Sequence, residues 1–181
     1  VMVGLNHLLV PYKVSSFTFP FVLITWFVLL AARIMHGLPD SGLSSPELPG
    51  NFSSTFDTGF SHLVIYWLTG ISQVFLINSW VTGILFLIGL AISNKWAAIW
   101  AAIASALSLA TAILYQCNGA DIANGLFGFS PVLTGIALGI TFYQVNWRTV
   151  IWSLVGIFAT VFIQAGMDTL FTPFGLPTLT G

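Results

Sequence analysis

Charged residues are almost absent from this 181-residue chain, and this scarcity limits its possible folds more than any other feature. Asp, Glu, Lys and Arg make up 5% of the sequence against 57% hydrophobic residues, and the mean hydropathy is +0.97. A soluble domain carries roughly 25% charged residues. This chain has too little polar surface to stay dispersed in water, so we expect lipid to be its main solvent.

The apolar runs predict helices that cross a membrane. In lipid every backbone N–H and C=O must be satisfied within the protein, which leaves α-helices for segments of this length. Tryptophans flank several of the runs, as expected at membrane interfaces: Trp80, Trp96, Trp147 and Trp152. The predicted spans are residues 17–35, 79–94, 96–115, 131–146 and 149–166. The expected fold class is therefore an all-α polytopic membrane protein.

Three segments interrupt this pattern. Residues 61–77 are apolar but contain Thr69-Gly70 and Gln73, so they are either a full span or a glycine-broken half-helix of the kind transport proteins use. Residues 118–130 are too polar and glycine-rich to span, and we expect them to fold back within the membrane. Residues 37–57 are rich in Gly, Pro and Ser, which predicts a solvent-exposed linker.

The start of the chain repeats near its end. Four residues align without a gap with four later ones: Gly4, Leu8, Pro11 and Thr18 with Gly166, Leu170, Pro173 and Thr180. We therefore divide the chain into residues 1–35, the end of a first repeat with its last helix; 36–57, an extracytoplasmic linker; and 58–181, a second repeat that lacks its last helix.

An odd number of spans per repeat predicts that the two repeats insert in opposite orientations. With the linker outside, Lys13, Lys95 and Arg148 lie in the cytoplasm and only Arg33 lies outside, as the positive-inside rule favours.

Neutral polar groups, rather than charges, populate the predicted spans. Charged groups inside a membrane mark ion or proton routes, and here Asp121 and Asp168 fall at predicted segment junctions. The chain offers neutral groups instead, which favours a neutral polar solute: Gln73, Thr18, Thr180, Thr134, Thr160 and Gln164.

Gln73 is the most informative of these groups, because its amide supplies one acceptor and two donors to a solute that bears amides. The residue alone fits a helix-packing glutamine at least as well. Thr18, before Phe19-Pro20, is either a helix N-cap or, together with Thr180, a hydroxyl that lines a pathway.

The remaining candidates have simpler interpretations. Phe127 and Phe129 are core or lipid-facing rings, or a flat aromatic wall for a flat solute. Gly135 and Gly139 form a small-xxx-small pattern that predicts helix packing.

Other classes of function lack their sequence signals. The three histidines have no metal-ligand spacing, no catalytic motif is present, and the net charge of −1 gives no basic patch for nucleic acid. We expect neither an enzyme nor a cofactor. Cys117, the single cysteine, is expected to pack as a small apolar residue.

Three motifs resemble signatures of the bacterial and animal urea transporter family, in the family's order and at about its spacing. They are Gly70-Ile71-Ser72-Gln73-Val74-Phe75, Asn124-Gly125-Leu126-Phe127-Gly128-Phe129, and Leu176-Pro177-Thr178-Leu179-Thr180. Residues 17–21 (FTFPF) resemble the last motif in the preceding repeat. One departure is Ser130, where the family usually has Asn.

The resemblance implies two inverted repeats, each of five spans and a tilted re-entrant helix, assembled as a homotrimer in the lipid bilayer, here a bacterial inner membrane. It implies a pore in each subunit through which urea passes down its gradient. Gln73 would bind urea at a pore mouth beside Val74 and Leu76. Phe129 and Leu133 would form part of an apolar slot, and Thr18 and Thr180 would lie at the central constriction.

Two alternatives to a urea channel remain open. The first is a channel for another small neutral solute, such as a short-chain amide, ammonia or water. The second is a membrane subunit that transports nothing. Because the first repeat's own motifs would precede Val1, we expect any activity to belong to a longer parent protein.

Overall fold

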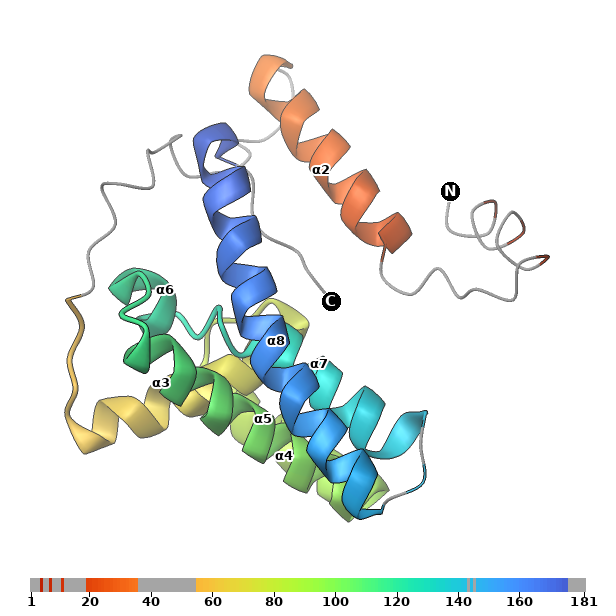
Figure 1. Cartoon of the computed structure of the whole chain (residues 1–181). Helices are drawn as coiled ribbons and strands as arrows, with labels where there is room; N and C mark the ends of the chain where they lie inside the picture. The colour runs from red at the N-terminus through yellow and green to blue at the C-terminus, as the bar shows by residue number, and fades with distance from the viewer. Residues whose placement is uncertain are drawn as a thin grey trace. The chain divides into compact units, whose positions relative to one another are not determined.

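The computed structural model describes residues 19–35, 55–142, 144 and 146–175, together with Gly4, His7 and Pro11, and among them the regular elements are helices joined by turns (Figure 1). The main helices are α2 (Phe19–Ile34), α3 (Phe60–Ser72), α4 (Trp80–Ser93), α5 (Lys95–Leu114), α6 (Gly119–Ala123), α7 (Phe129–Ile136) and α8 (Trp147–Phe171). Three short helical turns extend them: η3 (Gln73–Phe75), the π-helical η4 (Ala137–Thr141) and η5 (Thr172–Phe174).

These residues fall into two compact units, described separately. One unit combines Val1–Pro49 with Met167–Gly181, and in it the Trp26 and Phe171 rings pack with centroids 4.6 Å apart. The other unit, Gly50–Gly166, holds α3 to α7 and most of α8. The division of the chain into inverted repeats stays a prediction, and residues 36–54 of the predicted linker lie outside the described residues.

Helices lie at the positions of the five predicted spans, with shifted ends, and two of them, α5 and α8, are by themselves long and apolar enough to cross a bilayer. The last one, α8, runs to Phe171 rather than to residue 166, so Asp168 lies in its final turn and not beyond it. The α-helix ends at Phe171, and the chain continues as the 3-10 turn η5, which contains Pro173, a residue without an N–H to donate to an α-helix. The predicted span 131–146 ends early, at Thr141, and Asn146 instead accepts a hydrogen bond from Thr149 N in the first turn of α8.

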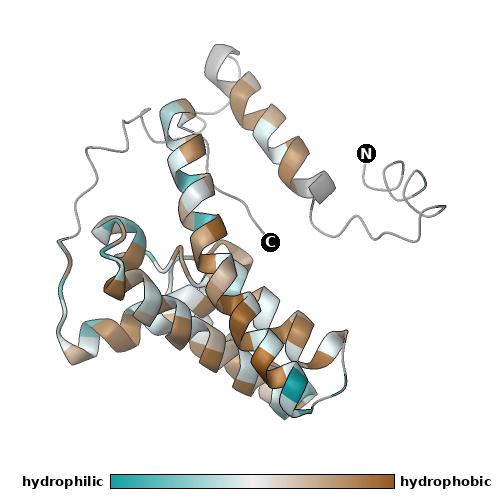
Figure 2. Ribbon diagram, viewed as in Figure 1, coloured by the Kyte–Doolittle hydropathy of each residue, from teal (hydrophilic) through white to brown (hydrophobic). Residues whose placement is uncertain are grey.

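Length and hydropathy separate the helices into two groups. Among the described residues, α5 and the run Trp147–Phe174 are each long and apolar enough to cross a bilayer, and apolar residues predominate along them (Figure 2). The α3–η3 segment and α4 meet that test only as a pair, whose axes are bent by 70°. The 14 residues of α4 rise about 21 Å, against about 30 Å of hydrocarbon. This pair is therefore a broken span or a re-entrant segment.

The sequence marked two possible breaks in this segment, Thr69-Gly70 and Gln73, and the structure has its break at the second. Helix α3 continues through Thr69 and Gly70 without interruption, and the helical path ends in η3 at Gln73–Phe75. Leu76 then adopts a left-handed conformation with φ of 57°, and residues 77–79 are non-helical. Gly70 does not break the helix. Because it has no side chain, Gly128 can pack closely against α3 at this position.

Helix α5 is the centre of the larger unit and contacts α3, α4 and α7. Its buried face consists of small residues and one tryptophan: Ala97, Trp100, Ala101, Ala104, Ser105, Ser108, Thr111 and Ala112. In lipid, small residues let helix backbones approach closely and gain van der Waals contact. The predicted packing role of two glycines is confirmed, since a Cβ on Gly135 would lie 2.8 Å from the Ala104 Cβ, and one on Gly139 would lie 2.6 Å from the Trp100 ring.

Two glycines of α4 provide a matched test of this packing. A Cβ on Gly83 would lie 2.1 Å from the Leu68 carbonyl oxygen of α3, whereas a Cβ on Gly89 would meet nothing within 4 Å. We expect Gly83→Ala to lower the free energy of unfolding by about 1–3 kcal/mol. Gly89→Ala should raise it by about 0.5–1 kcal/mol, since alanine favours a helix. Unfolding midpoints in detergent measure both, and equal midpoints would contradict the packing of α4 on α3.

Candidate functional site

The broken segment after α3 is held by a buried serine. The Ser72 hydroxyl is fully buried; it lies 2.8 Å from the Thr69 carbonyl and 2.6 Å from the Ile77 carbonyl, and donates to one of them. It also accepts from the Ser79 N–H at 3.4 Å. A buried backbone group without a partner is costly, so Ser72 makes this break possible away from water.

Three glycines bring α3 against a turn that lies more than fifty residues later. A Cβ on Gly125 would lie 2.5 Å from Gly70 N, and a Cβ on Gly128 would lie 2.4 Å from Gly70 Cα. Gly125 also has φ of +69°, a conformation that other residues rarely adopt. Only about 10 Å³ of cavity remains beside this glycine junction, which consists of Gly70, Gly125 and Gly128. The backbones of α3 and of the turn 124–128 therefore touch directly.

Gln73 lies at the edge of the glycine junction, in the turn where α3 ends. It is 6% exposed, and its Nε2 donates to the Asn124 carbonyl at 2.6 Å. Its Oε1 makes no hydrogen bond to any other described residue. The amide thus fixes the turn with one N–H and retains an acceptor for another group.

Asparagines extend the polar contacts at the same place. The exposed Asn78, in the broken segment, donates from Nδ2 to Asn124 Oδ1 at 2.8 Å. Asn118 accepts from Ala120 N at the start of α6 and donates to the Asp121 carboxylate at 3.1 Å. Burial raises the pKa of the Asp121 carboxyl above its ordinary value, and the hydrogen bond from Asn118 partly opposes that rise.

The structure brings part of the predicted pathway together. The η3 turn that holds Gln73 and Val74 contacts α7, which holds Phe129 and Leu133. Val74, Phe129 and Leu133 are half-buried, and Leu76 is 53% exposed. Their role in a pathway stays a prediction, and Thr18 and Thr180 lie outside the described residues.

Other candidates have structural roles. Phe127 is 5% exposed and packs with Ala112, Ile122 and Val161, so it belongs to the core rather than to an open wall. The Thr134 and Thr160 hydroxyls lie 3.2 Å apart and join α7 to α8. Among the described residues, no group of three or more His, Cys, Asp or Glu side chains comes together to hold a metal.

Sequence reasoning gave no site role to two residues that contact the turn. Asn78 follows the glutamine motif. Its contact with Asn124 could not be predicted, because the two residues are 46 positions apart in the sequence. Gln164 was counted only among the neutral polar groups, yet its Nε2 donates to the Leu126 carbonyl at 2.7 Å. No local spacing relates these pairs, since they form only when the helices pack.

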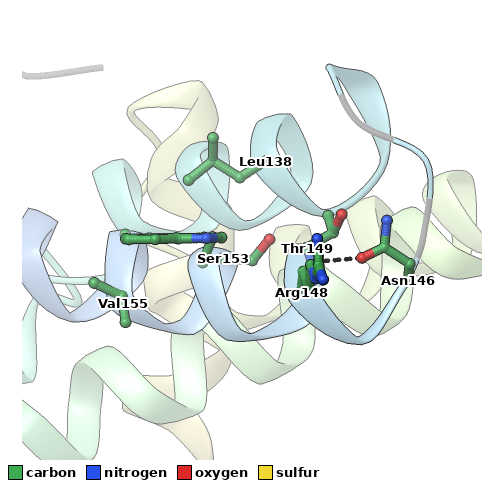
Figure 3. Close-up of a pocket in the computed structure, with 8 residues that line it drawn as sticks. Leu138, Asn146, Arg148, Thr149, Ser153 and Val155 are labelled. Atoms are coloured by element: carbon green, nitrogen blue, oxygen red, sulfur yellow. Dashed lines mark hydrogen bonds between the residues drawn. The ribbon is translucent and has the colours of Figure 1, made fainter.

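A larger pocket of about 580 Å³ lies elsewhere in this unit (Figure 3). Figure 3 shows Leu138 on one side and Arg148, Thr149, Ser153 and Val155 of α8 on the other. None of the predicted pathway residues is among its described lining. Its walls are mostly apolar and it is open to the surroundings, so we give it no role in binding a polar solute.

The chain is an all-α polytopic membrane protein, since the regular elements of its described residues are helices and two of these, or three if the bent pair is one span, can cross a bilayer. A family model described as urea transporter matches residues 1–181. The chain therefore belongs to the urea transporter family.

Curated relatives match parts of the chain. It is 32% identical to urea transporter 1 of Rattus norvegicus over 116 residues, which are 62% of this chain and 30% of that protein. It is 37% identical to urea transporter 1 of Mus musculus over 73 residues, 40% of this chain and 19% of that protein. Urea transporter 1 of Ovis aries is 30% identical over 116 residues, again 62% and 30%. The chain thus spans less than a third of the length of these relatives.

The raised pKa of Asp121 predicts a pH-dependent stability. A charged carboxylate is disfavoured in the folded state at pH above the raised pKa, so stability should increase as pH falls through that pKa toward 3.8, the ordinary pKa of an aspartate carboxyl. Asp121→Asn should remove this slope and raise the unfolding midpoint near pH 7. Midpoints of both proteins between pH 4 and about 8 measure the difference, and parallel curves would refute the assignment.

Proposed function

We propose that the full-length protein of which this chain is part passes urea across a membrane by passive, channel-like diffusion. One observation carries the proposal beyond family membership. Gln73 is buried at the glycine junction with one N–H engaged by Asn124 and its Oε1 without a partner among the described residues. That oxygen is suited to accept an N–H from a neutral amide.

The chemistry of urea fits the groups around Gln73. Urea is planar and uncharged, with four N–H donors and one carbonyl acceptor, so it requires acceptors more than donors. The half-buried Val74, Phe129 and Leu133 provide an apolar boundary. Desolvation costs a bare ion far more than a neutral amide, so apolar walls with a few amide and backbone acceptors favour urea over ions.

The absence of charge in the helix interiors supports a passive route. Residues 80–93 of α4 and 96–114 of α5 contain no Asp, Glu, Lys or Arg, and neither do residues 149–167 of α8. Asp168 lies beyond them in the final turn of α8, near the end of the run Trp147–Phe174. A proton-coupled carrier would be expected to hold an ionisable group inside a span. Weak binding without charge also suits rapid passage.

The finer assignments are part of this proposal and rest on the motif resemblance. They are a homotrimer in the inner membrane of a bacterium, with Gln73, Val74 and Leu76 at a pore mouth and Thr18 and Thr180 at the constriction. The relatives compared above are mammalian. A complete pathway requires the parent protein, because the chain spans at most 30% of those relatives.

Replacement of Gln73 in the parent protein tests the proposed site. We expect Gln73→Ala to lower urea permeability by roughly fivefold or more, since a hydrogen bond contributes about 1 kcal/mol. Thr134→Ala is the control, because Thr134 bonds to Thr160 between α7 and α8, and its permeability should stay near that of the wild type. Stopped-flow light scattering of proteoliposomes measures both. Equal permeability of the two variants would remove Gln73 from the pathway.

Passive diffusion also predicts independence from a proton gradient. Urea uptake into proteoliposomes should follow the urea gradient alone and stop when the two concentrations are equal, with or without an uncoupler. Radiolabelled urea measures this endpoint. Accumulation above the external concentration that an uncoupler abolishes would indicate a coupled carrier.

A further inference from the structure

A second glutamine contacts the same turn as Gln73. Gln164, on α8, is 2% exposed, and its Nε2 donates to the Leu126 carbonyl at 2.7 Å. Gln73 donates to the Asn124 carbonyl, two residues earlier, at 2.6 Å. The turn Asn124–Gly128 is therefore held by amides from two elements far apart in the sequence.

The contacts of Gln164 do not fit a purely packing role. Its Oε1 is fully buried and has no hydrogen-bond partner among the described residues. A buried acceptor without a partner costs free energy, and a methionine of similar volume would fill the space without that cost. The feature that an amide adds at this position is the hydrogen bond to the turn.

Several other contacts also hold the turn. Asn78 donates to Asn124 Oδ1, Gly125 N donates to the Ile122 carbonyl at 3.0 Å, and Phe127 packs in a core cluster with Val161 of α8. Within it, Leu126 N donates to the Asp121 carbonyl at 3.0 Å and Gly128 N to the Gly125 carbonyl at 2.9 Å. Outside it, the glycine junction and Gln73 hold the side next to α3. Gln164 holds the turn from α8, and Phe129 begins α7 directly after Gly128. A shift of the turn would therefore move the start of α7.

We propose that Gln164 is a positioning residue for the solute pathway. It fixes the Leu126 carbonyl, and through it the turn that sets the placement of Phe129 relative to Gln73. This role rests on the proposed urea pathway, but Gln164 acts through the turn and does not need to touch the solute.

The test compares two α8 variants of the full-length protein. Gln164→Met keeps the volume and removes the hydrogen bond. Ser153→Ala is the matched control, because Ser153 is fully buried on the same helix and its hydroxyl has no partner among the described residues. Amide hydrogen exchange of residues 124–128 reports the turn, and stopped-flow permeability to urea and to N-methylurea reports the pathway.

In Gln164→Met we expect the amides of Leu126 and Gly128 to exchange about fivefold faster, the factor that corresponds to one hydrogen bond. Urea permeability should fall by a similar factor, and the ratio of urea to N-methylurea permeability should fall because a displaced wall discriminates less. Ser153→Ala should match the wild type in all three measurements.

The possible failures are distinguishable. A wild-type protein that passes no urea would refute the proposed function, while hydrogen exchange would still test the contact between Gln164 and the turn. Unchanged exchange in Gln164→Met overturns the positioning role. So does an equal fall in the permeability to both solutes, since a lower amount of folded protein alone would produce it.

Discussion

Backbone that leaves a helix inside a membrane has no water to satisfy its N–H and C=O groups, and we propose that the described part of the larger unit has two such places. One is the segment 73–79 after α3, and the other is the turn 124–128 before α7. Side chains supply the missing partners: Ser72 for the first, and Gln73 and Gln164 for the second. The polar groups that support these breaks are also those that a neutral solute would meet.

Close packing of small residues makes this arrangement possible. Gly70 lets the turn touch the backbone of α3, and the Ala and Ser face of α5 lets α3, α4 and α7 gather around one helix. With larger residues the two breaks would separate, and Gln73 would lose its contact with Asn124. The same glycines that leave no room for side chains thus place an amide beside apolar groups, which is the combination we propose for urea.

The apolar runs and flanking tryptophans predicted the helices well, because lipid leaves helices as the solution for such segments. The broken segments were also recognised. Of the two interruptions marked in the first segment, Gln73 lies at the break, whereas Gly70 serves close packing within α3. The hydrogen-bond partners of the two glutamines could not be predicted from the sequence. Asn124 lies 51 residues after Gln73, and Leu126 lies 38 residues before Gln164. Family motifs drew attention to Gln73, whereas no motif marks Gln164.

We propose that the full-length protein selects a neutral amide by apolar walls and uncharged acceptors. Guanidinium is the best comparison solute, because it is planar and close to urea in size but carries a positive charge. In stopped-flow measurements on proteoliposomes of the full-length protein, urea should enter much faster than into protein-free vesicles, and guanidinium should not. Equal entry of urea and guanidinium, or no acceleration of urea, would show that the protein does not select a neutral amide in this way.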